Sequence, residues 1–192
     1  MDKETDIEVF REAVEVLKAG GVILYPTDTV WGLGCDATNE EAVSKIYEIK
    51  KRSDSKSLIT LVSDADMLGR YVRTIPEVAI NLLEVNDKPM TIIYPGAINL
   101  APNVVAQDGS AGIRIPMSEF CRELVRRFRR PIVSTSANVS GEPSPAFYRE
   151  IPSCIVEAAD WVADPRFEKG ATGRSSQIIK VGLRGEISII RA

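Results

Sequence analysis

The sequence contains no histidine among its 192 residues. Histidine is the side chain whose unperturbed pKa lies closest to neutral pH, and it is the most common metal ligand. Its absence excludes Ser-His-Asp and Cys-His catalytic groups, and also zinc or iron sites held by imidazole. Any catalysis by this chain must therefore use other side chains.

Cysteine is also scarce. Cys35, Cys121 and Cys154 are widely spaced and no CxxC pair occurs, so we expect no metal cluster and no disulfide framework. The acidic start MDKETD does not have the layout of a signal peptide, and no apolar run approaches the roughly 18 residues that span a bilayer. We therefore expect a cytoplasmic protein with no membrane partner.

The length and the composition predict one globular domain over residues 1–192, with 44% hydrophobic and 27% charged residues. The formal net charge is only −3, from 24 basic and 27 acidic residues, but the charge is unevenly distributed. Residues 45–56 and 114–130 are both basic, the latter with six arginines. Two such segments indicate an anion-binding site. Solvent-exposed helix faces explain them equally well.

The hydropathy pattern predicts alternating helices and strands, and hence an α/β fold. Apolar spacings of three and four residues predict helices at 7–19, about 39–51, 64–85 with a break near Pro76, 118–129 and, weakly, 146–158. Short apolar runs predict strands at 21–25, 57–62, 90–94, 111–116 and 131–136, and a closing hairpin of 177–181 and 186–190. The hairpin makes the sheet mixed. We expect the first two strands to be consecutive and linked by a helical crossover.

Three segments carry polar groups at the ends of predicted strands, where α/β sheets bind ligands. The first, YPTDTVWGLG at 25–34, lacks the glycine spacing of a nucleotide fingerprint. A hydroxyl-capped turn with Trp31 in the core explains it as well as a ligand loop does. The second comprises Lys50, Arg52 and Lys56, which either stabilise a helix C-terminus or bind phosphate or carboxylate. The third, STSANVSGEPSP at 134–145, is either a long polar turn or a ligand loop.

Arg114 lies within the apolar run GIRIP, where a charge is costly unless it is paired, faces a polar cleft or lies on an edge strand. The carboxylates of Asp28, Asp108 and Glu142 have no evident partner in the sequence. The polar inventory is thus dominated by cations and hydroxyls, which bind anions and stabilise charge. Phosphoryl or nucleotidyl transfer needs mainly positioning and electrostatics, so it fits this inventory best.

YPTDTVWGLG, the KKR of 50–52, GIRIP and STSANVSGEPSP, in this order, resemble the YrdC-like family of L-threonylcarbamoyladenylate synthases. The resemblance extends from about Gly20 to Arg191. It includes the KxR pair of the family as Lys50 and Arg52, and its SxN pair as Ser136 and Asn138. The chain resembles the short, single-domain branch.

The resemblance implies an open, twisted sheet with a concave, positively charged face. It also implies a nucleotidyltransferase that makes threonylcarbamoyl-adenylate from L-threonine, bicarbonate or CO2, and ATP, with release of pyrophosphate. ATP would be a substrate, Mg²⁺ would come with its triphosphate, and no metal would be held by the protein itself. A partner complex would transfer the product to adenosine 37 of tRNA, and weak binding of tRNA or double-stranded RNA is expected.

The resemblance also assigns roles to individual residues. Those expected to contribute to catalysis are Lys50, Arg52, Ser136 and Asn138. Those expected to bind threonine are Thr29, Arg114, Ser136 and Ser176. Those expected to bind the nucleotide are Arg52, Lys56, Ser134, Ser144 and Arg191. Two positions depart from the pattern: Leu61 replaces a histidine that many members carry, and Asn99 ends a segment that many members write PGPxT.

Two other hypotheses remain open. An RNA-binding module could use the same basic face, although aromatic residues make up only 6% of the chain and no stacking motif is present. A carbamoyl-handling paralogue could use the same fold with a different substrate.

Overall fold

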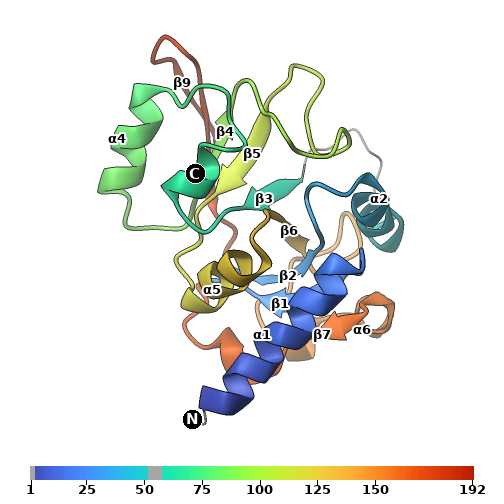
Figure 1. Ribbon diagram of the computed structural model, residues 1–192. Helices are drawn as coiled ribbons and strands as arrows, with labels where there is room; N and C mark the ends of the chain where they lie inside the picture. Colours follow the sequence, from blue (N-terminus) through green and yellow to red (C-terminus); the bar gives the residue numbers. More distant parts are fainter. Residues whose placement is uncertain (1–2, 52–57) are drawn as a thin grey trace.

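The computed structural model describes residues 3–51 and 58–192, so the predicted site residues Arg52 and Lys56 lie outside the described residues. In the described part of the chain, nine strands form one sheet in the order β7-β1-β2-β6-β3-β5-β4-β8-β9 (Figure 1). The pairs β1–β7, β3–β5 and β4–β8 are parallel, and the other neighbours are antiparallel. The predicted mixed α/β sheet is therefore confirmed. The strands are β1 Ile23–Pro26, β2 Trp31–Gly34, β3 Ile59–Leu61, β4 Met90–Tyr94, β5 Ala111–Arg114, β6 Ile132–Ser136, β7 Trp161–Val162, β8 Gln177–Val181 and β9 Ile187–Arg191.

The helices begin where the sequence provides capping residues. The Asn39 side chain accepts hydrogen bonds from the backbone N–H groups of Glu41 and Ala42, and Ser118 accepts one from Cys121. The segment predicted as helix over 64–85 with a break near Pro76 is helical only at Ala65–Leu68 and Glu77–Val85, and Pro76 directly precedes the second helix, where proline is tolerated. The helices are α1 Lys3–Lys18, α2 Glu40–Ile49, α3 Ala65–Leu68, α4 Glu77–Val85, α5 Glu119–Phe128 and α6 Ser153–Ala158, with 3₁₀ turns η1 Tyr148–Glu150 and η2 Pro165–Glu168.

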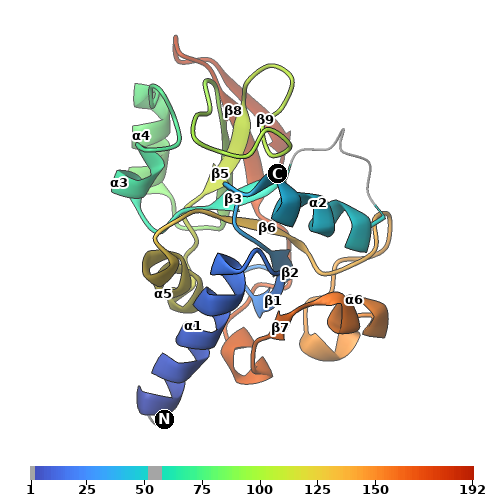
Figure 2. The same ribbon diagram turned by 45° about the vertical axis from the view of Figure 1, so that its right-hand side comes forward.

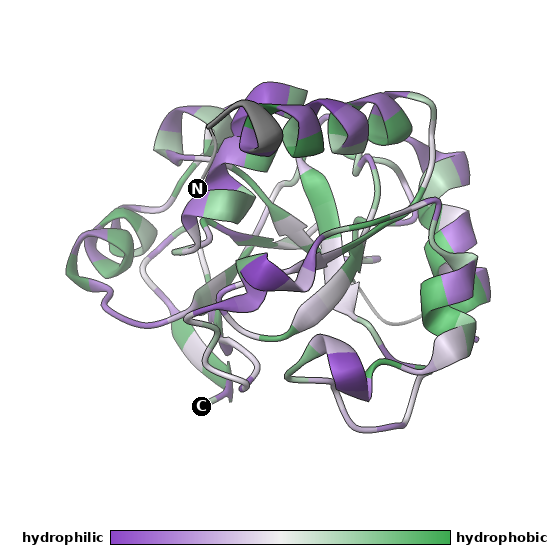
Figure 3. Ribbon diagram, turned by 90° about the horizontal axis from the view of Figure 1, so that it is seen from below, coloured by the Kyte–Doolittle hydropathy of each residue, from purple (hydrophilic) through white to green (hydrophobic). Residues whose placement is uncertain are grey.

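Helices α1 and α5 lie side by side against the sheet (Figures 1 and 2). Phe120 of α5 joins Phe10 of α1 to Phe167 of η2, with ring centroids 5.2 and 4.8 Å apart. Figure 3 shows that the helices carry both apolar and polar residues, as expected when one face is buried and the other is exposed. This apolar packing holds the helices against the sheet. The strand ends that these helices do not cover are available to build a site.

Two short strands were missed by the sequence analysis, which placed residues 31–34 in a loop and gave residues 161–162 no strand. β2 contains two glycines, which have low strand propensity, and β7 has only two residues. A Cβ atom on Gly34 would lie 2.6 Å from the Val133 carbonyl oxygen and 2.7 Å from a ring carbon of Tyr25. Close packing therefore requires glycine at position 34, and strand propensity contains no information about such packing.

The two strands predicted at 21–25 and 57–62 are not consecutive, so the prediction of a direct helical crossover between them was wrong. β2 intervenes and pairs with β1 as an antiparallel hairpin, so α2 connects β2 to β3. β6 lies between β2 and β3 and is antiparallel to both. As a consequence, the residues of β6 have the β1–β2 hairpin on one side and β3 on the other.

Candidate active site

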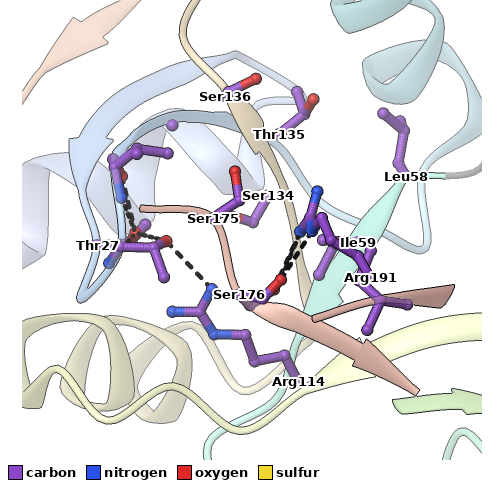
Figure 4. Close-up of a pocket in the computed structure, with 14 residues that line it drawn as sticks. Thr27, Leu58, Ile59, Arg114, Ser134, Thr135, Ser136, Ser175, Ser176 and Arg191 are labelled. Carbon is purple, nitrogen blue, oxygen red and sulfur yellow. Dashed lines mark hydrogen bonds between the residues drawn. The ribbon is translucent and has the colours of Figure 1, made fainter. Parts of the chain in front are cut away.

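A cavity of about 210 Å³ opens where the β1–β2 turn, β6 and the segment before β8 meet (Figure 4). Its lining is rich in hydroxyl groups and includes two arginines. A Cβ atom on Gly32 would lie 3.2 Å from the Thr135 carbonyl oxygen and 3.4 Å from Ser134 Oγ, so the absence of a side chain there keeps the wall open. The lining residues are Thr27, Thr29, Val30, Gly32, Leu58, Ile59, Arg114, Ser134, Thr135, Ser136, Ser175, Ser176, Ile178 and Arg191.

Thr27 organises the β1–β2 turn. Its Oγ1 accepts hydrogen bonds from the backbone N–H groups of Thr29 (3.1 Å) and Val30 (3.3 Å). It donates its single proton to the Val30 carbonyl oxygen at 2.7 Å. This arrangement confirms the hydroxyl-capped turn, with Trp31 in the core at 1% exposure. It also places Thr29 beside the cavity, so the capped turn forms part of the cavity lining.

Arg114 is paired and lines the cavity, as two of the options from the sequence had it, and its partner is Asp28, a carboxylate with no evident partner in the sequence. β5 lies in the interior of the sheet, so the edge-strand explanation is wrong. The guanidinium forms an ion pair with Asp28 and donates from Nη1 to Thr29 Oγ1 at 3.2 Å. Asp28 also accepts the backbone N–H of Met117 at 3.2 Å. Both partners of the ion pair are buried, at 5% and 9% exposure, and the pair joins β5 to the β1–β2 turn at the cavity.

Lys50 lies behind the cavity wall rather than in the lining. Its ammonium donates to the carbonyl oxygens of Ser136 and Asn138, the latter at 2.6 Å, and its own carbonyl accepts the N–H of Ser140 at 2.9 Å. The side-chain amide of Asn138 is turned to its own loop, where it donates to the carbonyl oxygens of Val139 and Glu142 at 3.0 and 2.6 Å. Lys50 and Asn138 therefore shape the segment that presents Ser136.

Ser176 and Arg191 form the opposite wall. Arg191 donates from Nε and Nη2 to the Ser176 carbonyl oxygen at 2.9 and 2.7 Å (Figure 4). Ser176 Oγ lies 2.8 Å from Thr91 Oγ1. Burial, followed by the nearby charge of Arg114, lowers the pKa of Arg191. The two guanidiniums therefore line one cavity, and that of Arg114 is paired with the buried carboxylate of Asp28.

The structure brings together six of the predicted site residues and leaves others outside. The six that line the cavity are Thr29, Arg114, Ser134, Ser136, Ser176 and Arg191. Lys50 and Asn138 are behind it, and Ser144 is exposed on the following loop. Sequence reasoning missed Thr27 and Asp28 as parts of the site. Arg114 could have pointed to Asp28, because an arginine in an apolar strand needs a partner and two unmatched opposite charges at strand ends can pair.

A second hollow of about 560 Å³ adjoins the cavity and shares Leu58, Ile59 and Ile178 with it. Gly112 leaves space on its floor, since a Cβ atom there would reach only van der Waals distance from Thr91 and Ile93. The Asp108–Lys180 ion pair, at 2.7 Å, closes one side, so Asp108 is also paired. The two hollows are therefore neighbours on the sheet, with three apolar residues common to both.

The basic segments separate in the structure. Of the six arginines at 114–130, only Arg114 lines the cavity. Arg126 and Arg127 pair with Glu123 on the exposed side of α5, at 2.8 and 2.6 Å, which is the helix-face explanation. In the described ranges no group of three or more Cys, Asp and Glu residues could hold a metal ion, and no helix there is long and apolar enough to cross a membrane.

Two buried groups near the cavity are poor nucleophiles. Burial, and then the charge of Asp28, raises the pKa of Cys121 to about 12. Burial also raises the pKa of Tyr25 above its usual range. Both groups stay protonated at neutral pH, so the charged groups in this part of the site are Asp28, Arg114 and Arg191.

This cavity in a nine-stranded mixed sheet is lined by hydroxyl groups and two guanidiniums, groups that can bind anions. Residues 15–192 match the family model Sua5_yciO_yrdC, described as "Telomere recombination", and the chain belongs to that family. It is 34% identical over 168 residues to the threonylcarbamoyl-AMP synthase of Stenotrophomonas maltophilia, a match that covers 86% of this chain and 88% of that protein.

Solved structures agree on the fold. The chain matches P. abyssi Sua5, crystallised in complex with L-threonine, with a TM-score of 0.80 and 27% identity over 90% of this chain. It spans about half the length of that protein (50%). E. coli YciO matches with a TM-score of 0.81 and 23% identity, covering 96% of this chain and 88% of YciO. YciO shares the size and the fold of this chain.

Proposed function

We propose that this chain is a threonylcarbamoyl-AMP synthase. It would join L-threonine, bicarbonate or CO2, and ATP, and release pyrophosphate. The observation that carries the proposal is the cavity itself, in which Arg114 and Thr29 meet the hydroxyls of β6 and Ser176 in a space of amino-acid size. The name of the S. maltophilia relative and the L-threonine bound to P. abyssi Sua5 support it.

The amino acid would occupy the cavity between Arg114 and Ser176. A guanidinium binds a carboxylate through parallel N–H donors, which makes Arg114 the partner of the substrate carboxylate. Ser176 and Ser136 would contact the rest of the amino acid. The volume of about 210 Å³ suits a small ligand and is below the roughly 300–1,000 Å³ of pockets that hold drug-sized molecules.

The nucleotide would extend from the cavity into the second hollow. Its floor of Ile59, Gly112 and Ile178 offers a flat, largely apolar surface for a base, and the hydroxyl of Ser134 and the guanidinium of Arg191 lie toward the phosphates. Arg52, Lys56 and Ser144 would complete the phosphate contacts. Mg²⁺ would enter as MgATP, bound to phosphate oxygens, because the cavity lining supplies hydroxyls and guanidiniums but no carboxylate.

The reaction would have two steps. The threonine amine attacks the carbon of CO2 and loses a proton, which gives a carbamate. A carbamate oxygen then attacks the α-phosphorus of ATP, and the bond between that phosphorus and the bridging oxygen breaks as pyrophosphate leaves. Fixed cations stabilise the negative charge that develops on the phosphate oxygens, a role that needs no imidazole.

The product would pass to a complex that transfers the threonylcarbamoyl group to tRNA. A cytoplasmic location, weak RNA binding and a single domain over 1–192 remain predictions that accompany this function. An RNA-binding module without ATP turnover is the alternative from another class, and its affinity would fall steeply with salt.

Mass spectrometry of the products tests the proposal directly. Incubation with L-threonine, bicarbonate and MgATP should give threonylcarbamoyl-AMP and pyrophosphate, and omission of any substrate should abolish both. Arg52→Ala should reduce the rate by about 10²–10³, the magnitude typical of a lost transition-state donor. Product formation with other amino acids but not with L-threonine would instead identify a paralogue with a different substrate. Absence of any adenylate would contradict the proposal.

A further inference from the structure

A charge that the proposed chemistry does not use lies next to the cavity, paired with one of its lining residues. Asp28 is buried at 9% exposure and forms an ion pair with Arg114, the arginine to which we assign the substrate carboxylate. Removing both charges from water is costly, and a buried ion pair is weak support for stability by itself. A carboxylate placed against a substrate-binding arginine therefore calls for a role in recognition.

An unpaired arginine in this setting would bind phosphate. Guanidinium groups bind phosphate and sulfate in the same way as they bind carboxylate, and the neighbouring hydroxyls of Thr29 and Ser134 would add further polar contacts. Because ATP and pyrophosphate are both reactants in the proposed function, phosphate groups would compete with the amino acid for Arg114. The negative charge of Asp28 acts against this competition, since a dianion at the guanidinium would also approach the carboxylate.

The hydroxyl groups of the turn point to the same preference. Thr27 Oγ1 gives its only proton to the Val30 carbonyl oxygen, so in the 2.8 Å contact between the two threonine hydroxyls Thr29 must be the donor. Thr29 Oγ1 then accepts from Arg114 and keeps one lone pair. It can accept a hydrogen bond from a ligand N–H or O–H, but it has no proton left for a phosphate oxygen.

We propose that Asp28 is a specificity-determining positioning residue, which holds Arg114 in place and makes this end of the cavity select a zwitterionic amino acid over a phosphate-type dianion. The inference rests on the proposed function, in which Arg114 receives the carboxylate. With Asp28 present the Asp28–Arg114 pair is electrically neutral. An amino acid adds one negative and one positive charge, and the positive amine has an acceptor in Thr29.

Isothermal titration calorimetry with two probes, L-threonine and sulfate, tests the inference on the full chain. Asp28→Asn keeps the size and the acceptor oxygen but removes the charge. It should bind sulfate about tenfold more tightly than the unsubstituted chain, and L-threonine about tenfold more weakly. Asp28→Glu keeps the charge but moves it, so it should weaken L-threonine binding and leave sulfate affinity unchanged.

Asp36→Asn is the matched control. Asp36 is also buried, at 2% exposure, and pairs with an arginine, Arg130, at 2.9 Å, but that arginine does not line the cavity, whereas Arg114 does. This variant should change neither affinity. Unchanged sulfate affinity in Asp28→Asn, or the same change in Asp36→Asn, would overturn the inference.

Should Asp28→Asn not fold, as judged by circular dichroism, Asp28→Glu decides alone. Weaker L-threonine binding with unchanged sulfate affinity supports the inference, and any other result contradicts it. These measurements need no turnover. A chain that makes no adenylate would contradict the proposed function, whereas the two affinities would still determine whether Asp28 selects against dianions.

Discussion

The arginine-rich segment 114–130 divides between two environments. Arg114 is buried against Asp28 at the cavity, whereas Arg126 and Arg127 share Glu123 on the exposed side of α5, with 56% and 41% of their side chains exposed. The residue type and the kind of partner are the same in both places. What differs is access to water, which screens the α5 pairs and leaves the cavity pair to depend on its own geometry.

This difference means that the charge of a segment does not by itself locate a site. The buried arginine has fixed partners on two sides, the Asp28 carboxylate and the Thr29 hydroxyl, so its orientation is set before a ligand arrives. The α5 arginines hold their partner through flexible side chains at the surface. Substitutions in the two regions should therefore differ in their effects on stability and on ligand binding.

Arg114→Gln should have the largest effect, because it leaves the Asp28 carboxylate buried without its cation. Breaking a buried pair in this way costs about 3–5 kcal/mol of unfolding free energy. L-threonine binding should be lost as well. Urea denaturation and calorimetry measure the two effects.

The double variant of Asp28→Asn with Arg114→Gln provides the control for that prediction. It removes both charges and should recover part of the lost unfolding free energy without restoring L-threonine binding. A double variant as unstable as Arg114→Gln alone would show that the cost does not come from the unpaired carboxylate.

Lys50→Met should have the next largest effect, and it extends the comparison to a buried ammonium. Lys50 is 1% exposed and donates to the carbonyl oxygens of Ser136 and Asn138, so the substitution removes a buried donor from both carbonyl groups. We expect a loss of about 1–3 kcal/mol in unfolding free energy, and faster hydrogen exchange in residues 136–140.

Lys45→Met is the comparison variant for Lys50. Lys45 is on the same helix and also donates to a carbonyl oxygen, that of Gly20 at 2.8 Å, but its side chain is exposed. It should leave exchange in residues 136–140 unchanged. Equal effects of the two substitutions would show that burial of Lys50 does not matter.

The sequence predicts the elements of the fold well where local signals agree. The helix starts predicted near residues 39 and 118 and the final hairpin depend on neighbouring residues, and the structure confirms them, whereas residues 69–76 before Pro76 are not helical. β2 was not predicted because Gly34, which lowers its strand propensity, is required by the close approach of Val133 and Tyr25 from other strands. Strand propensity contains no information about such a contact.

The sequence predicted which residue types build the site, but not which of the charged residues pair with one another. Hydroxyls at strand ends indicated a ligand site, and six of the predicted residues line one cavity. That Asp28 meets Arg114 depends on the order of the strands, which places the β1–β2 turn beside the end of β5 across β6 and β3. The burial of Lys50 was unpredictable for the same reason. A lysine at a helix end is usually solvated, so only the contact with β6 and its loop explains why this one is buried.

The smallest effect is expected on α5, where Glu123→Gln removes the anion that Arg126 and Arg127 share. Burial raises the pKa of this carboxyl, but hydrogen bonds from Arg127 and Arg126 outweigh it and the pKa in the folded chain is lowered. A depressed folded-state pKa contributes stability above the unfolded value of about 4.3, and this contribution is lost as the pH falls through the folded value.

Because the pairs are largely exposed, the loss at pH 7 should be no more than about 1 kcal/mol. Urea denaturation of Glu123→Gln and of the unsubstituted chain should show this difference at pH 7, a smaller one at pH 7 in 1 M NaCl, and a diminishing one as the pH falls below about 4. A loss as large as that of Arg114→Gln, or one insensitive to salt, would remove the distinction between the two environments. L-threonine affinity should be unchanged, since neither Glu123 nor its arginines line the cavity.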